Sequence, residues 1–256
     1  MSETSLRAYC ARVLGFSNAR DVESALGSIR LSVTYRAELV LLGDIAAELV
    51  SVARALHRRA VGADRPFIVC NPRRRSKCAT VRAPMNYDRG VVAFRAARGG
   101  SLCLLQERTP EDLPALATLV RGSDVPVQII VLAEAQYELH PFLLRPAPIR
   151  VPPLRERARE VPRIVDEYVR DAVSMLGAGE SCFTDDDRAW VLARAATTLS
   201  EIEKATLRLV ALRLSWSVAE AAERLGMSHA ALAQWLDRRG WWRRALGRRR
   251  EPGESH

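Results

Sequence analysis

Near the end of the chain, the residue types follow the pattern of two short helices joined by a tight turn. Gly226 permits the left-handed backbone that such a turn requires, and Ser228 is typical of the residue that caps the next helix. Small side chains allow the two helices to approach closely, and leucines can fill the space between them. These core positions are Ala221, Ala222, Leu225 and Leu232. The pattern predicts a helix-turn-helix.

The second helix of this motif, from His229 to Arg239, offers an exposed face that can read DNA. Gln234 can pair bidentately with adenine, and alanine can contact a thymine methyl group. Arginines at and beyond the end of the helix can contact phosphates. The candidate DNA-binding residues are Ser228, His229, Ala230, Ala233, Gln234, Arg238, Arg239, Arg243 and Arg244.

The net charge of +9 is concentrated near the C-terminus, where Arg238 to Arg250 carries seven arginines and no acidic residue. A localised basic block is typical of a nucleic-acid partner, although a solvated tail has the same composition. The helix pair also allows a second interpretation. Trp235, Trp241 and Trp242 can pack at a subunit interface, which would make the motif a dimerisation hairpin.

Cysteine and histidine form no pattern that indicates catalysis or a metal site. The five cysteines lack any CxxC pair, and the four histidines are scattered singly. Reduced structural thiols are therefore expected, with no metal and no cofactor.

The composition is that of a globular protein of one or two domains. The chain has 256 residues, of which 48% are hydrophobic and 27% charged. Its apolar runs are far shorter than the ~20 residues that a membrane helix needs. The N-terminus, MSETSLRAYC, lacks the apolar region of a secretory signal. We therefore expect a cytoplasmic protein.

The first half of the chain alternates apolar strands with helices, which predicts an α/β fold with a parallel sheet covered on both faces. After Pro152-Pro153 the strand signals stop and the pattern is helical throughout. The expected strands are Ala37–Leu42, Pro66–Cys70, Ser101–Leu105 and Val125–Ala133, and the expected helices are Ile45–Arg59, Pro114–Val120, Val161–Met175, Asp185–Ala196, Leu199–Leu214, Val218–Leu225 and His229–Arg239.

Several segments resemble bacterial sigma-54-dependent transcription activators of the NtrC type, which are AAA+ proteins. The most specific is Ile149-Arg-Val-Pro-Pro-Leu-Arg-Glu-Arg-Ala-Arg-Glu-Val-Pro, which is similar to the stretch that joins the ATPase core of this family to its helical lid. Arg65–Asn71 and Ala97–Leu104 resemble two further family segments, and 218–240 resembles a Fis-type helix-turn-helix. The resemblance implies an N-terminal extension (1–21), an AAA+ core (22–153), a lid (154–213), a DNA-binding domain (214–246) and a tail (247–256).

The segment that aligns with the phosphate loop of this family departs from it. Such a loop needs several glycines, a lysine for the outer phosphates and a hydroxyl for magnesium. Here the first glycine, Gly43, is followed by Asp44, while Glu48 adds a negative charge expected to face any phosphate and Leu49 replaces the lysine. The site is expected to be closed to ATP.

Other nucleotide-handling positions depart from the family as well. Leu105 and Gln106 replace its acidic pair, and strand alternation predicts that Glu107 points to the other face. In the family, an asparagine senses the γ-phosphate, and this position aligns with Gln136. The arginine fingers align with a stretch near Arg145, and the sensing arginine of the lid aligns with Ser200. The loop with which this family contacts the sigma factor is missing. Residues 73–77 instead carry the basic run Arg-Arg-Arg-Ser-Lys, which could contact an acidic partner or nucleic acid or could simply be a solvated loop.

Two functions from different classes follow from this combination. The first is a DNA-binding transcriptional regulator that is not an enzyme, binds duplex DNA and forms a homo-oligomer or an assembly with related AAA+ or other regulatory proteins. The second is a non-catalytic interaction or scaffolding protein that joins other subunits. Salt-dependent DNA binding distinguishes them.

Overall fold

A computed structural model describes residues 3–35, 37–75, 78, 84–134 and 147–238 of the chain. They form two compact units, which we treat separately. The first contains the described residues up to Ile164 together with Thr197–Glu201. The second contains Val165–Ala196 and the described residues from Ile202 onward.

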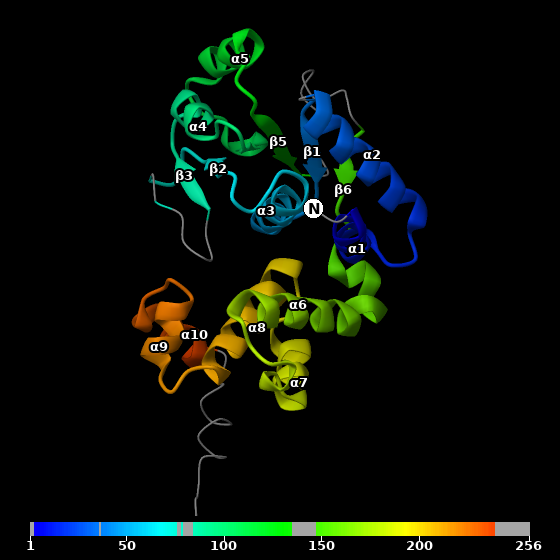
Figure 1. Ribbon diagram of the computed structural model, residues 1–256, viewed down its shortest axis with the longest axis vertical. Coiled ribbons are helices and arrows are strands. Elements are labelled where there is room, and N and C mark those ends of the chain that lie inside the picture. Colours follow the sequence, from blue (N-terminus) through cyan, green and yellow to red (C-terminus); the bar gives the residue numbers. More distant parts are fainter. Residues whose placement is uncertain (1–2, 36, 76–77, 79–83, 135–146, 239–256) are drawn as a thin grey trace, which may run out of the picture. The chain divides into compact units, whose positions relative to one another are not determined.

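The first unit is built on a six-stranded sheet in the order β3-β2-β4-β5-β1-β6 (Figure 1). Every pairing is parallel. The strands are β1 (Leu39–Leu42), β2 (Phe67–Cys70), β3 (Met85–Tyr87), β4 (Ser101–Leu105), β5 (Gln128–Ala133) and β6 (Ile149–Arg150). The parallel α/β architecture expected from the apolar runs is confirmed. The edge strands β3 and β6 were not predicted.

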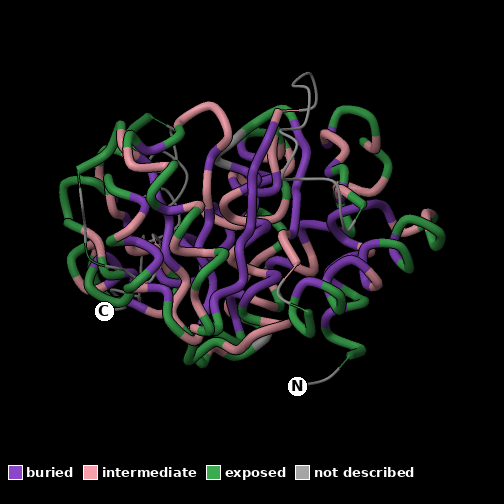
Figure 2. Tube along the Cα trace, turned by 90° about the horizontal axis from the view of Figure 1, so that it is seen from above, coloured by how far each residue is buried: buried purple, intermediate pink, exposed green. Residues whose placement is uncertain are grey.

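Helices cover both faces of this sheet. They are α1 (Glu3–Leu14), α2 (Ala19–Tyr35), α3 (Ala46–Ala60), α4 (Gly90–Ala96) and α5 (Leu113–Gly122). Val40 and Leu42 share one apolar core with Phe94 of α4 and Leu116 of α5. The alternate residues of β1 face the other side, where α2 and α3 contact β1 and β5. Buried residues therefore run along the central strands (Figure 2).

A buried chain of polar side chains joins α2 and α3 to the sheet. Nδ1 of His57 lies 2.8 Å from Oγ of Ser101, which lies 2.8 Å from Oε1 of Gln128. Nε2 of Gln128 donates to Oγ of Ser32 at 3.0 Å. Burial lowers the pKa of His57, which favours a neutral imidazole. His57 therefore has a structural role.

The second unit is helical. It holds most of α6 (Val161–Leu176), α7 (Asp185–Arg194), α8 (Leu199–Arg213) after its first turn, α9 (Val218–Arg224) and α10 (His229–Arg238). Asp187 is buried, forms a capping box with Thr184 and accepts two hydrogen bonds of 3.0 Å from Arg213. This bidentate ion pair fastens α8 to α7.

Candidate functional site

The loop that aligns with a phosphate loop follows β1 and is packed shut. The backbone N–H of Gly43 donates to the carbonyl of Ala133 at 3.1 Å, so it is not available to a phosphate. A Cβ atom at Gly43 would lie 2.9 Å from Cδ2 of Leu49, which is 1% exposed. Leu49, at the position of the family lysine, therefore fills the space under the loop.

Glu48 does not face this loop, which corrects the expectation from the sequence. Its carboxylate is buried and accepts a hydrogen bond of 2.7 Å from the backbone N–H of Leu199, at the start of α8. Burial raises the pKa of Glu48, and the bond from Leu199 and the charge of Arg157 oppose that rise. Oγ of Ser51, one turn along α3, lies 3.3 Å from Oγ of Ser200. Both contacts lie within the first unit and hold 197–201 against α3.

Asp44, also in this loop, is half-exposed and forms an ion pair with Arg155. The Nη2 and Oδ2 atoms are 2.7 Å apart. Arg155 follows the Pro152-Pro153 pair, so the contact fixes the loop after β1 to the segment after β6. Sequence reasoning missed this pair because its partners are 111 residues apart.

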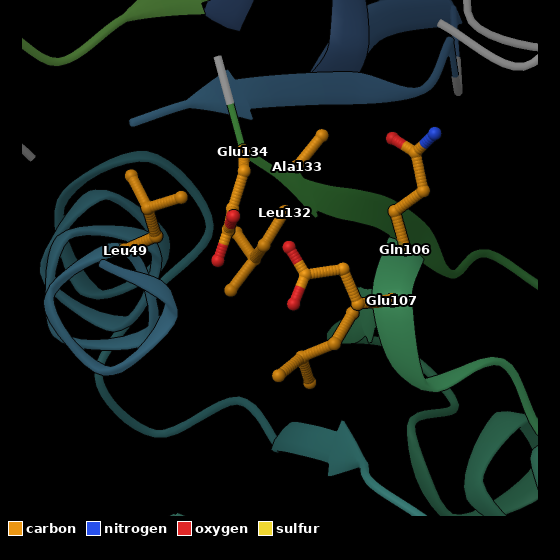
Figure 3. A pocket seen from close by; sticks show the side chains of 7 residues that line it. Leu49, Gln106, Glu107, Leu132, Ala133 and Glu134 are labelled. Carbon is orange, nitrogen blue, oxygen red and sulfur yellow. The ribbon is translucent and has the colours of Figure 1, made fainter. Parts of the chain in front are cut away.

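A small pocket lies at the carboxyl ends of β4 and β5 (Figure 3). Its volume is about 10 Å³, close to the minimum for one water molecule. Glu107 and Glu134 extend toward one another across it, whereas Gln106 extends away from them. The lining residues are Leu49, Leu105, Gln106, Glu107, Leu132, Ala133 and Glu134.

Glu107 and Gln106 extend in different directions, as the sequence predicts, but Glu107 and not Gln106 lies toward Glu134. The strand ends at Leu105 and the chain continues as a 3₁₀ turn, Gln106–Arg108, so strand alternation no longer applies. The pKa of Glu134 is raised, first by the neighbouring carboxyl group of Glu107, then by burial and by the charge of Asp44. A neighbouring carboxyl group therefore disfavours the charged form of Glu134.

Neither the bonded Gly43 amide nor the pocket lining suits the phosphates of a nucleoside triphosphate. A triphosphate needs free loop amides and a cation, but the Gly43 amide is bonded and the pocket lining contains no lysine or arginine. The two lining carboxylates would repel phosphate oxygens. Carboxylates do bind magnesium, but no group of three or more His, Cys, Asp or Glu side chains suited to a metal occurs among the described residues.

The helix pair α9–α10 has the local geometry expected of a helix-turn-helix. Oγ of Ser217 accepts from the N–H of Glu220 at the start of α9, and Gly226 has a φ of 60° in the turn. Oγ of Ser228 accepts from the N–H of Ala231 at 3.2 Å and so caps α10. The motif core, Ala221, Ala222, Leu225, Leu232 and Leu236, is buried.

Most of the candidate DNA-binding residues in the described part of the chain are on the surface. Gln234 and Arg238 are exposed on α10, whereas Ala233 is half-buried. Ser228, His229 and Ala230 are exposed at the start of the helix. Arg239, Arg243 and Arg244 lie outside the described residues. The first two turns of α10 therefore present small and polar side chains to the solvent.

Trp235 packs inside its own unit, which differs from the subunit-interface role considered for it. Its ring makes an edge contact with Trp190 of α7, with centroids 5.5 Å apart. The guanidinium of Arg208 lies 4.6 Å from its centroid. Trp235 therefore anchors α10 on α7 and α8. The other two tryptophans of that interpretation, Trp241 and Trp242, lie outside the described residues.

Comparisons with known proteins show a distant similarity. The chain is 25% identical over 206 residues to the transcriptional regulatory protein XylR of Pseudomonas putida, a match that covers 64% of the chain. The chain spans only about a third (35%) of the length of XylR. No family model matches the chain.

Solved structures of NtrX from Brucella abortus are also similar. The NtrX complex with ADP gives a TM-score of 0.47 at 16% identity, covering 92% of this chain and 72% of that one. The NtrX complex with ATP gives a TM-score of 0.44 at 18% identity, covering 87% of this chain and 68% of that one. Within the described ranges, no helix is both long and apolar enough to span a membrane.

Proposed function

We propose that this chain is a DNA-binding transcriptional regulator that resembles a sigma-54-dependent activator but neither hydrolyses ATP nor contacts the sigma factor through the family loop. The observation that carries the proposal is the construction of α10. Ser228 caps the helix, Leu232 and Leu236 hold it in the core, and Gln234 remains exposed to read a base edge.

The closed loop after β1 supports a regulator that is not an enzyme. Leu49 occupies the space below Gly43, and the Glu48 carboxylate is engaged with Leu199. Such a protein acts by occupying DNA or by contacting other proteins in the cytoplasm, as a homo-oligomer or with related regulators. The distant similarity to a transcriptional regulatory protein agrees with this proposal.

The experiment that tests the proposal is genome-wide mapping of the sites bound by the protein, followed by titration of the recovered duplexes. Discrete sites that share a sequence, bound more tightly than random duplex, are the expected result. Uniform recovery of the genome without enriched sites would contradict a sequence-specific regulator.

One observation favours the second candidate, a non-catalytic interaction protein. Trp216, two residues before α9, is 90% exposed, and large aromatic side chains are enriched in protein interfaces. Under this alternative, Trp216→Ala lowers the oligomeric mass or abolishes capture of a partner while duplex binding is unchanged. A regulator that binds DNA predicts the recognition-helix effects described in the Discussion.

A further inference from the structure

A second basic region lies in the first unit, far from the C-terminal arginines in sequence. Residues 65–98 contain nine lysines and arginines and one acidic residue, Asp88, for a net charge of +8. This segment forms β2, β3 and α4 at one edge of the sheet (Figure 1). The described arginines of this segment lie on or next to β2, β3 and α4.

At the carboxyl end of β2, three consecutive arginines stand on a well-ordered turn. Oδ1 of Asn71 accepts from the N–H of Arg73 at 3.1 Å, and its carbonyl accepts from the N–H of Arg74 at 3.0 Å. Nδ2 of Asn86 on β3 donates to the carbonyl of Arg74 at 3.0 Å, with the carbonyl of Arg75 at 3.4 Å. Both asparagines are buried. We call Arg73, Arg74 and Arg75 the arginine turn.

The side chains of the arginine turn are directed to the solvent and remain available to a partner. All three residues are exposed. In the part of the chain that the structure describes, no ion pair joins any of them to a carboxylate. Three adjacent guanidinium groups concentrate positive charge at this turn.

We propose that the arginine turn binds the phosphate backbone of duplex DNA and forms a sequence-independent contact in addition to that of the recognition helix. The inference rests on the proposed DNA-binding function. Guanidinium groups match phosphate oxygens bidentately, and duplex DNA presents phosphates at regular, close spacing. An acidic protein is the weaker fit, because the described residues around the three arginines include no exposed aromatic side chain, and protein interfaces depend on such anchors.

The test compares duplex binding by the full chain carrying Arg73→Ala, Arg74→Ala and Arg75→Ala with binding by a charge-matched control. The control carries Arg20→Ala, Arg121→Ala and Arg150→Ala, three exposed arginines on other elements. Random duplex is titrated over a series of salt concentrations. We expect the arginine-turn variant to weaken binding to all duplexes alike and to reduce the slope of log K against log[salt] by roughly two to three. In the control variant, this slope should differ from that of the wild type by less than about one.

Equal slopes for the arginine-turn variant and the control would overturn the inference, because net charge and not position would then explain the loss. A further variant with lysine at all three positions should retain most of the slope. Competition by poly-glutamate as effective as competition by duplex DNA would contradict the assignment to DNA. A wild-type protein that binds no duplex would overturn the proposed function as well. Wild-type binding that is unaffected by the arginine-turn substitutions would overturn only this inference.

Discussion

The carboxylate of Glu48 on α3 caps the first turn of α8 by accepting the backbone N–H of Leu199 at 2.7 Å, across 151 residues of sequence. Free amides at a helix N-terminus favour a negatively charged partner. Here that partner is the buried carboxylate of Glu48. This acidic residue, in the segment after β1, thus has a structural function. It holds Thr197–Glu201 in the first unit.

Replacing Glu48 separates this capping role from the cost of burying a charge. Glu48→Ala should lower the free energy of unfolding by about 1–2 kcal/mol, because it leaves the Leu199 amide without an acceptor. Glu48→Gln retains an acceptor oxygen and should cost much less. Chemical denaturation of both variants gives these differences. An equal loss in the two variants would show that the charge, and not the hydrogen bond, matters.

The fold was largely predictable because the central strands are continuous apolar runs. β1, β2, β4 and β5 are such runs, whereas the edge strands read Met-Asn-Tyr and Ile-Arg and give no pattern. The site was less predictable. The alternation of side chains along β4 does not extend to Glu107, because the strand ends at Leu105 and a 3₁₀ turn follows. The hydrogen-bond partner of Glu48, Leu199, is distant in sequence. Such contacts depend on tertiary packing, which local spacing does not encode.

Glu134, which lies next to Glu107, should make the stability of the fold depend on pH. The pKa of Glu134 is raised in the folded state, so its stabilising contribution is present below the usual glutamate pKa and is lost as the pH rises through the raised value. Glu134→Gln should therefore raise the melting temperature at pH 7 and have little effect at pH 4. The exposed Glu111, changed to glutamine, is the matched control. If Glu111→Gln raised the melting temperature at pH 7 as much as Glu134→Gln does, the effect would not come from the contact between Glu134 and Glu107.

Nucleotide binding should be absent in the wild-type protein. Calorimetric titration with ATP and magnesium should give no heat at millimolar nucleotide, because Leu49 fills the space below the loop. Leu49→Lys should not create binding, and it should destabilise the fold because it buries an amino group beside apolar side chains. A micromolar dissociation constant for the wild type, about −8 kcal/mol, is the result that this prediction excludes.

Gln234 and Trp235, adjacent on α10, should respond differently to replacement. Gln234→Ala should weaken binding to a preferred duplex by about 1–3 kcal/mol, affect random duplex much less and leave the melting temperature nearly unchanged. Trp235→Ala removes the contacts with Trp190 and Arg208 and should lower the melting temperature. Equal loss on specific and random DNA for Gln234→Ala would remove its base-reading role.

The central claim is that this chain binds DNA without using nucleotide. The most direct test is titration of a labelled duplex with the full chain, first in nucleotide-free buffer and then with millimolar ATP and magnesium. We expect salt-dependent binding with the same dissociation constant in both buffers. Failure to bind duplex DNA, or binding that appears only with ATP, would contradict it.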